Sequence, residues 1–193
     1  MAEAQKKIYS KEEALAEKDF LVSEMKAGKI FIYPTDTVYG LGMNAEMAQS
    51  GEMINRIKKR EGKKFLIIAP SFDWIFENCK CLDQIKKVLQ DKLPGPFSFR
   101  LKMKNKNIFS DAEETVGVRI TDNWFCDFVS RSGVPFITTS VNLAGQSPLL
   151  RIKDLDEEIL QQVDYVISDD ASLSGKPSTL IDLVSKEEKI LRA

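Results

Sequence analysis

Residues 30–42, IFIYPTDTVYGLG, carry the two signals on which the fold prediction depends. The first four residues are apolar or aromatic, which predicts a buried strand, and Pro34 ends it. Thr35, Asp36 and Thr37 follow directly, before glycines that permit close approach of the backbone. These polar residues suit either a ligand site or a turn closed by local hydrogen bonds, and the residues alone favour neither interpretation.

Helix and strand patterns interleave on both sides of this segment. Ser10 and Glu13 have the spacing of a capping box, which predicts a helix that Gly28 ends. Residues 97–103 alternate between apolar and mostly basic side chains, which predicts a strand with one basic face. Further helices are expected near 46–59, 72–77, 82–91, 122–129 and 154–162, and further strands at 65–69, 115–120, 134–139, 164–168, 179–184 and 189–192.

This order of elements predicts an α/β (α+β) layered domain. Its sheet would be twisted, with mixed parallel and antiparallel strands, and flanked by helices. We expect a short N-terminal tail at residues 1–9 and a single domain at residues 10–193.

The composition excludes several kinds of chemistry. The 193 residues include no histidine, which rules out a Ser-His-Asp or Cys-His nucleophile system and a His-ligated metal. Cys79, Cys81 and Cys126 fit neither a disulfide framework nor a zinc ribbon and favour a reducing compartment. With neither a secretory signal nor a membrane-spanning stretch in the sequence, we expect a cytoplasmic protein.

The charges are segregated although 28 basic residues nearly balance 29 acidic ones. Six of the nine residues from Arg56 to Lys64 are basic, and Lys58 and Arg60 lie at the end of the helix expected at 46–59. Cations at that position complement the helix dipole, and they could equally clamp a polyphosphate. The residues alone leave both interpretations open.

Two further polar segments adjoin predicted strands. Residues 138–142, TTSVN, could bind phosphate oxygens or a small polar substrate, or could form a cap and a turn. Residues 174–179, SGKPST, superficially match the end of a phosphate-binding P-loop. Pro177 breaks that pattern and Asp170 occupies the position of the first glycine, so we reject a P-loop.

Six segments occur together in the order and spacing of the YrdC-like family, the threonylcarbamoyl-AMP synthases. They are PTDTVYGLG, the K-x-R of IKKREGKKFLIIA, PGPFSF, TVGVRI, TTSVNLAG and KPSTLIDL. The resemblance covers about residues 10–193 and implies the YrdC-like fold in its short, single-domain form. It implies ATP, L-threonine and bicarbonate as substrates, with threonylcarbamoyl-AMP and pyrophosphate as products. It also implies a partner enzyme that transfers the threonylcarbamoyl group to tRNA.

The resemblance further implies roles for individual residues. Lys58 and Arg60 would be catalytic and would grip the ATP phosphates. The ATP-binding residues would be Lys58, Arg60, Thr115, Ser140, Asn142 and Arg192. The threonine-binding residues would be Thr35, Arg119 and Ser178. No protein side chain is assigned to a metal: Mg²⁺ would arrive with ATP, and Asp36 is a candidate for assisting the metal or the threonine ammonium.

The sequence departs from the family pattern at three positions. Glu61 stands where a proline commonly follows K-x-R, Ala69 where many members have a histidine near the threonine, and Val141 where a small residue is usual. The missing histidine is compatible with the chemistry, because a carbamate nucleophile is already an anion. Such a reaction needs alignment and charge neutralisation rather than a strong base.

The alternative is a non-catalytic double-stranded RNA or tRNA-binding factor that acts in translation or ribosome maturation. Its support is the basic strand face formed by Arg100, Lys102, Lys104 and Lys106, together with the Arg56–Lys64 cluster. Aromatic residues do not alternate with these charges, which argues against recognition of single strands.

Overall fold

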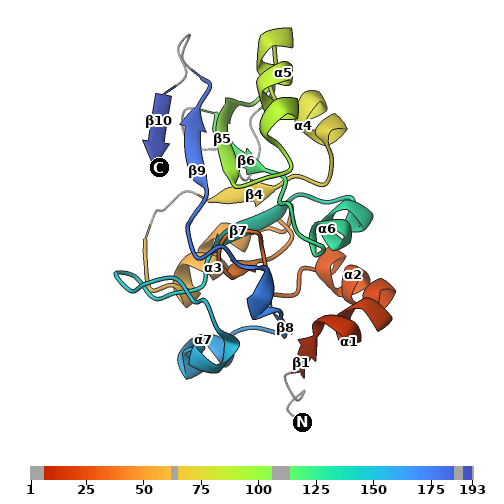
Figure 1. Ribbon diagram of the computed structural model, residues 1–193, viewed down its shortest axis with the longest axis vertical. Helices are drawn as coiled ribbons and strands as arrows, with labels where there is room; N and C mark the ends of the chain where they lie inside the picture. Colours follow the sequence, from red (N-terminus) through yellow and green to blue (C-terminus); the bar gives the residue numbers. More distant parts are fainter. Residues whose placement is uncertain (1–6, 62–64, 106–113, 185–188, 193) are drawn as a thin grey trace.

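A mixed ten-stranded sheet organises the part of the chain that the computed structural model describes, residues 7–61, 65–105, 114–184 and 189–192. The strands lie in the order β1-β8-β2-β3-β7-β4-β6-β5-β9-β10, and helices flank the sheet (Figure 1). The strands are β1 (Lys7–Ser10), β2 (Phe31–Tyr33), β3 (Gly40–Gly42), β4 (Leu66–Ile68), β5 (Phe97–Lys102), β6 (Thr115–Arg119), β7 (Phe136–Ser140), β8 (Tyr165–Ser168), β9 (Thr179–Asp182) and β10 (Lys189–Arg192).

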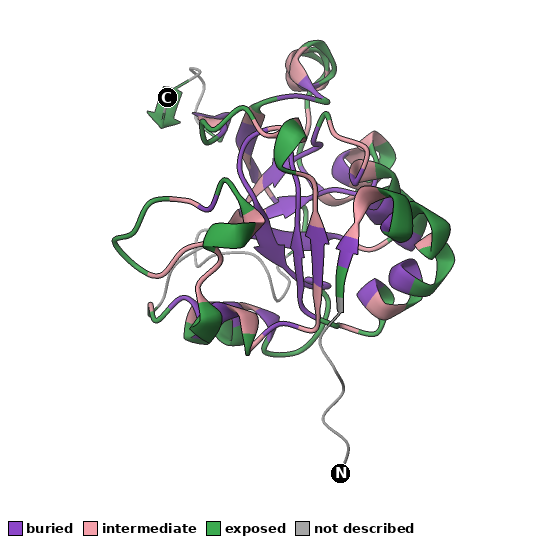
Figure 2. Ribbon diagram, turned by 60° about the horizontal axis from the view of Figure 1, so that its bottom comes forward, coloured by how far each residue is buried: buried purple, intermediate pink, exposed green. Residues whose placement is uncertain are grey.

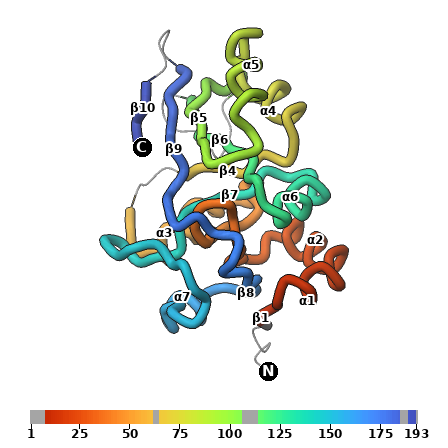
Figure 3. Tube along the Cα trace, viewed as in Figure 1, coloured from red at the N-terminus to blue at the C-terminus, as the bar shows by residue number. Residues whose placement is uncertain are grey.

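The sheet contains both parallel and antiparallel pairs, which confirms the predicted mixed topology. The pairs β1–β8, β8–β2, β4–β6 and β5–β9 are parallel. The pairs β2–β3, β3–β7, β7–β4, β6–β5 and β9–β10 are antiparallel. The trace in Figure 3 shows how β9, close to the C-terminus, lies beside β5 from the middle of the chain.

The helices cover the sheet and its ends. They are α1 (Lys11–Ala16), α2 (Lys18–Lys26), α3 (Ser50–Ile57), α4 (Phe72–Asn78), α5 (Asp83–Lys92), α6 (Cys126–Ser132) and α7 (Glu157–Leu160), with 3₁₀ turns η1 (Ile152–Asp154) and η2 (Asp170–Ser172). The capping box predicted at Ser10 and Glu13 is present at the start of α1. In the described segments, no helix is long and apolar enough to span a membrane.

The segment 30–33 is buried on both faces, as its apolar sequence predicts. Phe31 and Tyr33 pack in the cluster beneath α1, α2 and α6, and Ile32, whose side chain points the other way, packs in the larger second cluster. Phe31, Ile32 and Tyr33 are all 0% exposed. In Figure 2 the central strands are mostly buried, and the helices around them are partly exposed.

The observed elements differ from the sequence prediction at four places. Residues 7–9, expected in the tail, belong to β1, which pairs with β8, so the sheet begins three residues before the predicted domain boundary. The helix expected between Ser10 and Gly28 is two helices, because the backbone leaves helical geometry at Glu17. The helix expected at 154–162 is the short helix α7 preceded by η1. Finally, β3 occupies Gly40–Gly42, where only a loop was expected.

Candidate active site

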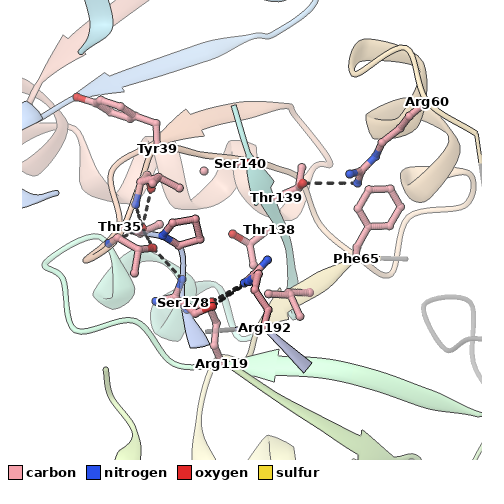
Figure 4. A pocket seen from close by; sticks show the side chains of 15 residues that line it. Thr35, Tyr39, Arg60, Phe65, Arg119, Thr138, Thr139, Ser140, Ser178 and Arg192 are labelled. Atoms are coloured by element: carbon pink, nitrogen blue, oxygen red, sulfur yellow. Dashed lines mark hydrogen bonds between the residues drawn. The ribbon is translucent and has the colours of Figure 1, made fainter. Parts of the chain in front are cut away.

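A cavity of about 220 Å³ opens where β2, β3, β6 and β7 end or begin. Its lining combines Thr35, residues 37–40, Arg60, residues 138–140 and Ser178, so the four polar segments singled out in the sequence meet at one place. In Figure 4, Arg60 and Thr139 lie at one end, and Thr35, Arg119 and Ser178 lie at the other. The cavity is therefore a two-ended site rich in hydroxyls and guanidinium groups.

The segment after β2 is a turn closed by local hydrogen bonds, and it also forms a wall of this cavity. The Thr35 hydroxyl donates to the Val38 carbonyl (2.7 Å) and accepts from the backbone N–H of Thr37 (3.1 Å). Its oxygen also lies 2.9 Å from the Thr37 hydroxyl oxygen. Both threonines are buried, and both line the cavity.

Arg119 places a positive charge in the wall of the cavity. It is 4% exposed and forms an ion pair with Asp36. Its Nη1 donates to the Thr37 hydroxyl (3.1 Å) and its Nη2 to the Gly95 carbonyl (3.4 Å). Among the described residues its Nε has no hydrogen-bond partner. Burial lowers the pKa of Arg119, and Asp36 opposes that shift. This Nε is itself buried, so it is an unsatisfied donor within the wall, while the Arg119 side chain as a whole contributes to the lining.

Arg192 reaches the same end of the cavity from β10, the edge strand. Its Nε and Nη2 donate to the Ser178 carbonyl (3.0 and 2.8 Å), and its Nη2 also contacts the Ser178 hydroxyl (3.0 Å). Burial, and then the nearby charge of Arg119, lower the pKa of Arg192. Arg119 and Arg192 thus both line this end of the cavity, and the Asp36 carboxylate balances the charge of Arg119.

Arg60 is held from three sides at the other end. Its Nε donates to the side-chain oxygen of Asn55 (2.9 Å), and its Nη2 lies 3.5 Å from the Thr139 hydroxyl. The guanidinium lies over the Phe65 ring, 5.0 Å from the centroid. Burial lowers the pKa of Arg60. The result is a planar cation in a fixed orientation, suited to phosphate oxygens.

Lys58 lies behind this wall rather than in it. The residue is 2% exposed, and its ammonium donates to the Ser140 carbonyl and to Asn142 Oδ1 (2.8 Å). Burial, followed by the charge of Arg60, lowers the pKa of Lys58 to about 7. The Asn142 amide donates to the carbonyls of Leu143 and Gln146, so Lys58 fixes the loop that carries Ser140.

The structure therefore brings most of the predicted site residues together. Those that line the cavity are Thr35, Arg60, Arg119, Ser140, Ser178 and Arg192. Lys58 and Asn142 lie directly behind Ser140. Thr115 does not join them: it is buried at the start of β6, where its hydroxyl accepts from Arg100 Nε (3.0 Å).

Sequence reasoning missed several contributors. Asn55 and Phe65 lie five residues before and after Arg60 in the sequence, but their contacts with its guanidinium depend on side-chain orientations that no motif indicates. Tyr39, which lies within the PTDTVYGLG segment, lines the cavity without having been assigned a role. Residues 174–179 act as a wall rather than a P-loop: the Gly175 N–H donates to the Thr37 carbonyl (2.8 Å).

The described basic residues of the strand face are engaged by neighbouring residues through ion pairs or a hydrogen bond. Arg100 pairs with Asp182 (3.3 Å) and Lys102 with Glu114 (3.6 Å), and the Lys104 ammonium donates to the Phe76 carbonyl (2.8 Å). Lys63, Lys64 and Lys106 lie outside the described residues. This face therefore offers fewer free cations for RNA phosphates than the sequence suggested.

Comparison with known proteins identifies a common family. The model of the Sua5, YciO and YrdC family, described as telomere recombination, matches residues 23–193. A protein of Methanocaldococcus jannaschii named putative threonylcarbamoyl-AMP synthase is 35% identical over 188 residues, 96% of this chain and 89% of its own. A threonylcarbamoyl-AMP synthase of Vibrio campbellii is 26% identical over 180 residues, 89% of this chain and 96% of its own.

A solved structure extends the comparison to the fold. The crystal structure of P. abyssi Sua5 complexed with L-threonine superposes with a TM-score of 0.85 at 22% identity and covers 96% of this chain. The present chain spans 56% of the length of that Sua5 chain. The likeness confirms the predicted fold.

Proposed function

The chain belongs to the Sua5/YciO/YrdC family, and from that premise we propose that it is an L-threonylcarbamoyladenylate synthase. It would convert ATP, L-threonine and bicarbonate into threonylcarbamoyl-AMP and pyrophosphate. The observation that carries the proposal is the cavity in which the hydroxyl-rich segments meet Arg60, Arg119 and Arg192. The names of the M. jannaschii and V. campbellii relatives support the same activity.

The two ends of the cavity suit the two larger substrates. Arg60 and Ser140 would bind ATP phosphates, and Lys58 and Asn142 would hold the Ser140 loop in position for that contact. Arg119 and Ser178 would bind L-threonine at the other end, with Thr35 shaping the turn beside it. The L-threonine complex of the related Sua5 supports an amino acid as ligand.

Arg192 lies next to Ser178 and Arg119, so we place it where the two substrates would meet. Thr115 is left out of direct ATP contact because it does not line the cavity.

The proposed chemistry requires no histidine. Threonine and bicarbonate would give N-carboxy-threonine with loss of water. A carboxylate oxygen of this carbamate would attack the α-phosphorus of ATP as the bond to pyrophosphate breaks. The nucleophile is an anion, so the protein contributes alignment and neutralisation of the phosphate charge. Arg60 and Arg192 are suited to that role because a guanidinium binds phosphate oxygens with a planar fork of donors.

Mg²⁺ is proposed to enter with the phosphates of ATP rather than in a protein cage. Within the described ranges, no group of three or more Cys, Asp or Glu side chains could hold a metal ion. The Asp36 carboxylate is paired with Arg119, which lines the cavity. Binding through substrate phosphates is common for Mg²⁺, which gives up its water ligands reluctantly.

The product would pass to a threonylcarbamoyl-transferring enzyme that modifies tRNA, and we propose a cytoplasmic location for both. Direct contact with tRNA remains a separate proposal. The ion pairs of the basic strand face give little support to a protein whose sole task is RNA binding.

Pyrophosphate release tests the proposal. The protein would be incubated with ATP, Mg²⁺, bicarbonate and each of the twenty amino acids in turn. Release that depends on both L-threonine and bicarbonate is expected. Release that is indifferent to the amino acid, or absent with all of them, would contradict the assignment.

A further inference from the structure

Two buried serines share one hydrogen bond at the threonine end of the cavity. Ser98 lies in β5 and Ser178 precedes β9, and parallel pairing of these strands brings the two hydroxyl oxygens to 2.7 Å. Ser98 is 0% exposed and Ser178 is 3% exposed. Ser178 lines the cavity, whereas Ser98 lies behind it. The direction of this hydrogen bond therefore decides what Ser178 can offer to a ligand.

Burial fixes that direction. The Ser178 oxygen is the one partner that the described residues offer to the Ser98 hydroxyl. If Ser178 donated to Ser98, the Ser98 proton would be buried without an acceptor, which proteins avoid. If Ser98 donates, its proton is satisfied, and Ser178 accepts from both Ser98 and Arg192.

The two lone pairs of the Ser178 oxygen are then both occupied. A serine hydroxyl has one proton and two acceptor positions. With Ser98 and Arg192 filling the acceptor positions, the Ser178 proton has no protein partner among the described residues and is left for the cavity. Ser178 can act there as a hydrogen-bond donor and not as an acceptor.

We infer that Ser98 is a positioning residue that makes Ser178 a dedicated donor to an oxygen atom of the amino-acid substrate. This inference rests on the proposed function, which places L-threonine at this end. The substrate atom is a carboxylate or hydroxyl oxygen, because an ammonium group has no lone pair to accept the proton. The positive charge of Arg119, which lines this end of the cavity, also favours an oxygen-bearing group here.

The variant Ser98→Ala tests this role. Without its donor, the Ser178 hydroxyl is free to rotate away from the substrate. The KM for L-threonine should rise about three- to tenfold, the effect of weakening one hydrogen bond, while kcat and the KM for ATP stay within about twofold. Ser132→Ala is the matched control: Ser132 is also buried, and its hydroxyl donates to the Val129 carbonyl (2.7 Å) in α6. That control should leave the KM for threonine unchanged.

A double-mutant cycle separates positioning from general loosening of the core. If Ser98 acts through Ser178, then Ser98→Ala should add nothing to the KM of Ser178→Ala. Additive effects, or equal changes in the KM values for threonine and ATP, would overturn the inference. Circular dichroism and urea unfolding of each variant verify that it is folded.

The activity of the wild-type protein distinguishes a failure of this inference from a failure of the proposed function. Wild-type protein that shows no threonine-dependent pyrophosphate release refutes the proposed function itself. Wild-type protein that is active, combined with an unchanged KM in Ser98→Ala, refutes only the role of Ser98.

Discussion

The Asp36 carboxylate and the Arg119 guanidinium form an ion pair in the wall of the cavity, with their side chains 10% and 5% exposed. The pair connects the loop after β2 to the end of β6, and its members are 83 residues apart in the sequence. A buried pair of this kind holds a cation at the site without leaving its charge unbalanced. Breaking it exposes that charge to a low-dielectric interior.

Asp36→Asn should destabilise the protein markedly. Arg119 would keep its charge and lose its counterion, so the free energy of unfolding should fall by about 3 kcal/mol. Asp127→Asn is the matched control, because Asp127 pairs with Lys18 and Arg131 while 50% exposed, and the control should lose less than about 1 kcal/mol. Urea unfolding at pH 7 measures both. Equal losses in the two variants would contradict the prediction.

Arg60→Ala should abolish pyrophosphate release while leaving the fold intact. The guanidinium held by Asn55 and Phe65 is the fixed phosphate donor of the proposed site, so its loss should lower kcat/KM by at least about a hundredfold. Arg131→Ala removes an exposed arginine of α6 and should retain normal turnover. Near-normal turnover in Arg60→Ala would exclude Arg60 from the chemistry.

Lys58→Ala should also lower activity, because the family resemblance implies that Lys58 grips the ATP phosphates, and the structure gives a different reason for the loss. Lys58 holds Ser140 and Asn142 rather than lining the cavity. Its removal should therefore loosen the Ser140 loop as well as weaken ATP binding. Limited proteolysis of residues 140–150 should become faster in this variant and not in Arg60→Ala. Equal cleavage rates in the two variants would mean that Lys58 does not fix the loop.

Gly42→Ala should be strongly destabilising although Gly42 has an ordinary strand conformation. A Cβ at this position would lie 1.7 Å from the Ile137 carbonyl oxygen, a backbone atom of the neighbouring strand. We expect a loss of about 3 kcal/mol or more in thermal or urea unfolding. Gly145→Ala adds the same methyl group where no atom lies within 4 Å, at a φ of +85°, and should lose about 1 kcal/mol. A Gly42→Ala variant as stable as Gly145→Ala would refute this explanation.

The same glycines explain why β3 was missed in the sequence. Gly40 and Gly42 have low strand propensity, so residues 40–42 look like a loop. Side chains there would collide with the Tyr33 ring and the Ile137 carbonyl, which means that glycine is required for the strands to pair. Local propensity was overridden by close packing that no local pattern can reveal. The neighbouring strand β2 was predicted correctly, because its run of apolar residues is typical of a buried strand.

The site was predictable as a set of segments but not as a set of contacts. Each polar segment follows or precedes a strand, a pattern that sequence can show, and the four segments do meet. Lys58 donates to Asn142 instead of lining the cavity, and Thr115 accepts a hydrogen bond from Arg100. Both contacts depend on side-chain packing across the sheet. The ion pair between Arg100 and Asp182, 82 residues apart, likewise follows from the pairing of β5 with β9.

Lys58 should make stability increase with pH above neutrality. Its pKa is lowered to about 7 in the folded protein from 10.5, so between these values the unfolded chain binds more protons than the folded one. Stability then rises with pH, by at most about 1.4 kcal/mol per pH unit from this group. Lys58→Met removes the titration, so the difference in unfolding free energy between wild type and variant, measured in urea from pH 7 to 9, should grow in favour of wild type. Curves that stay parallel over this range would show that Lys58 titrates normally in the folded protein.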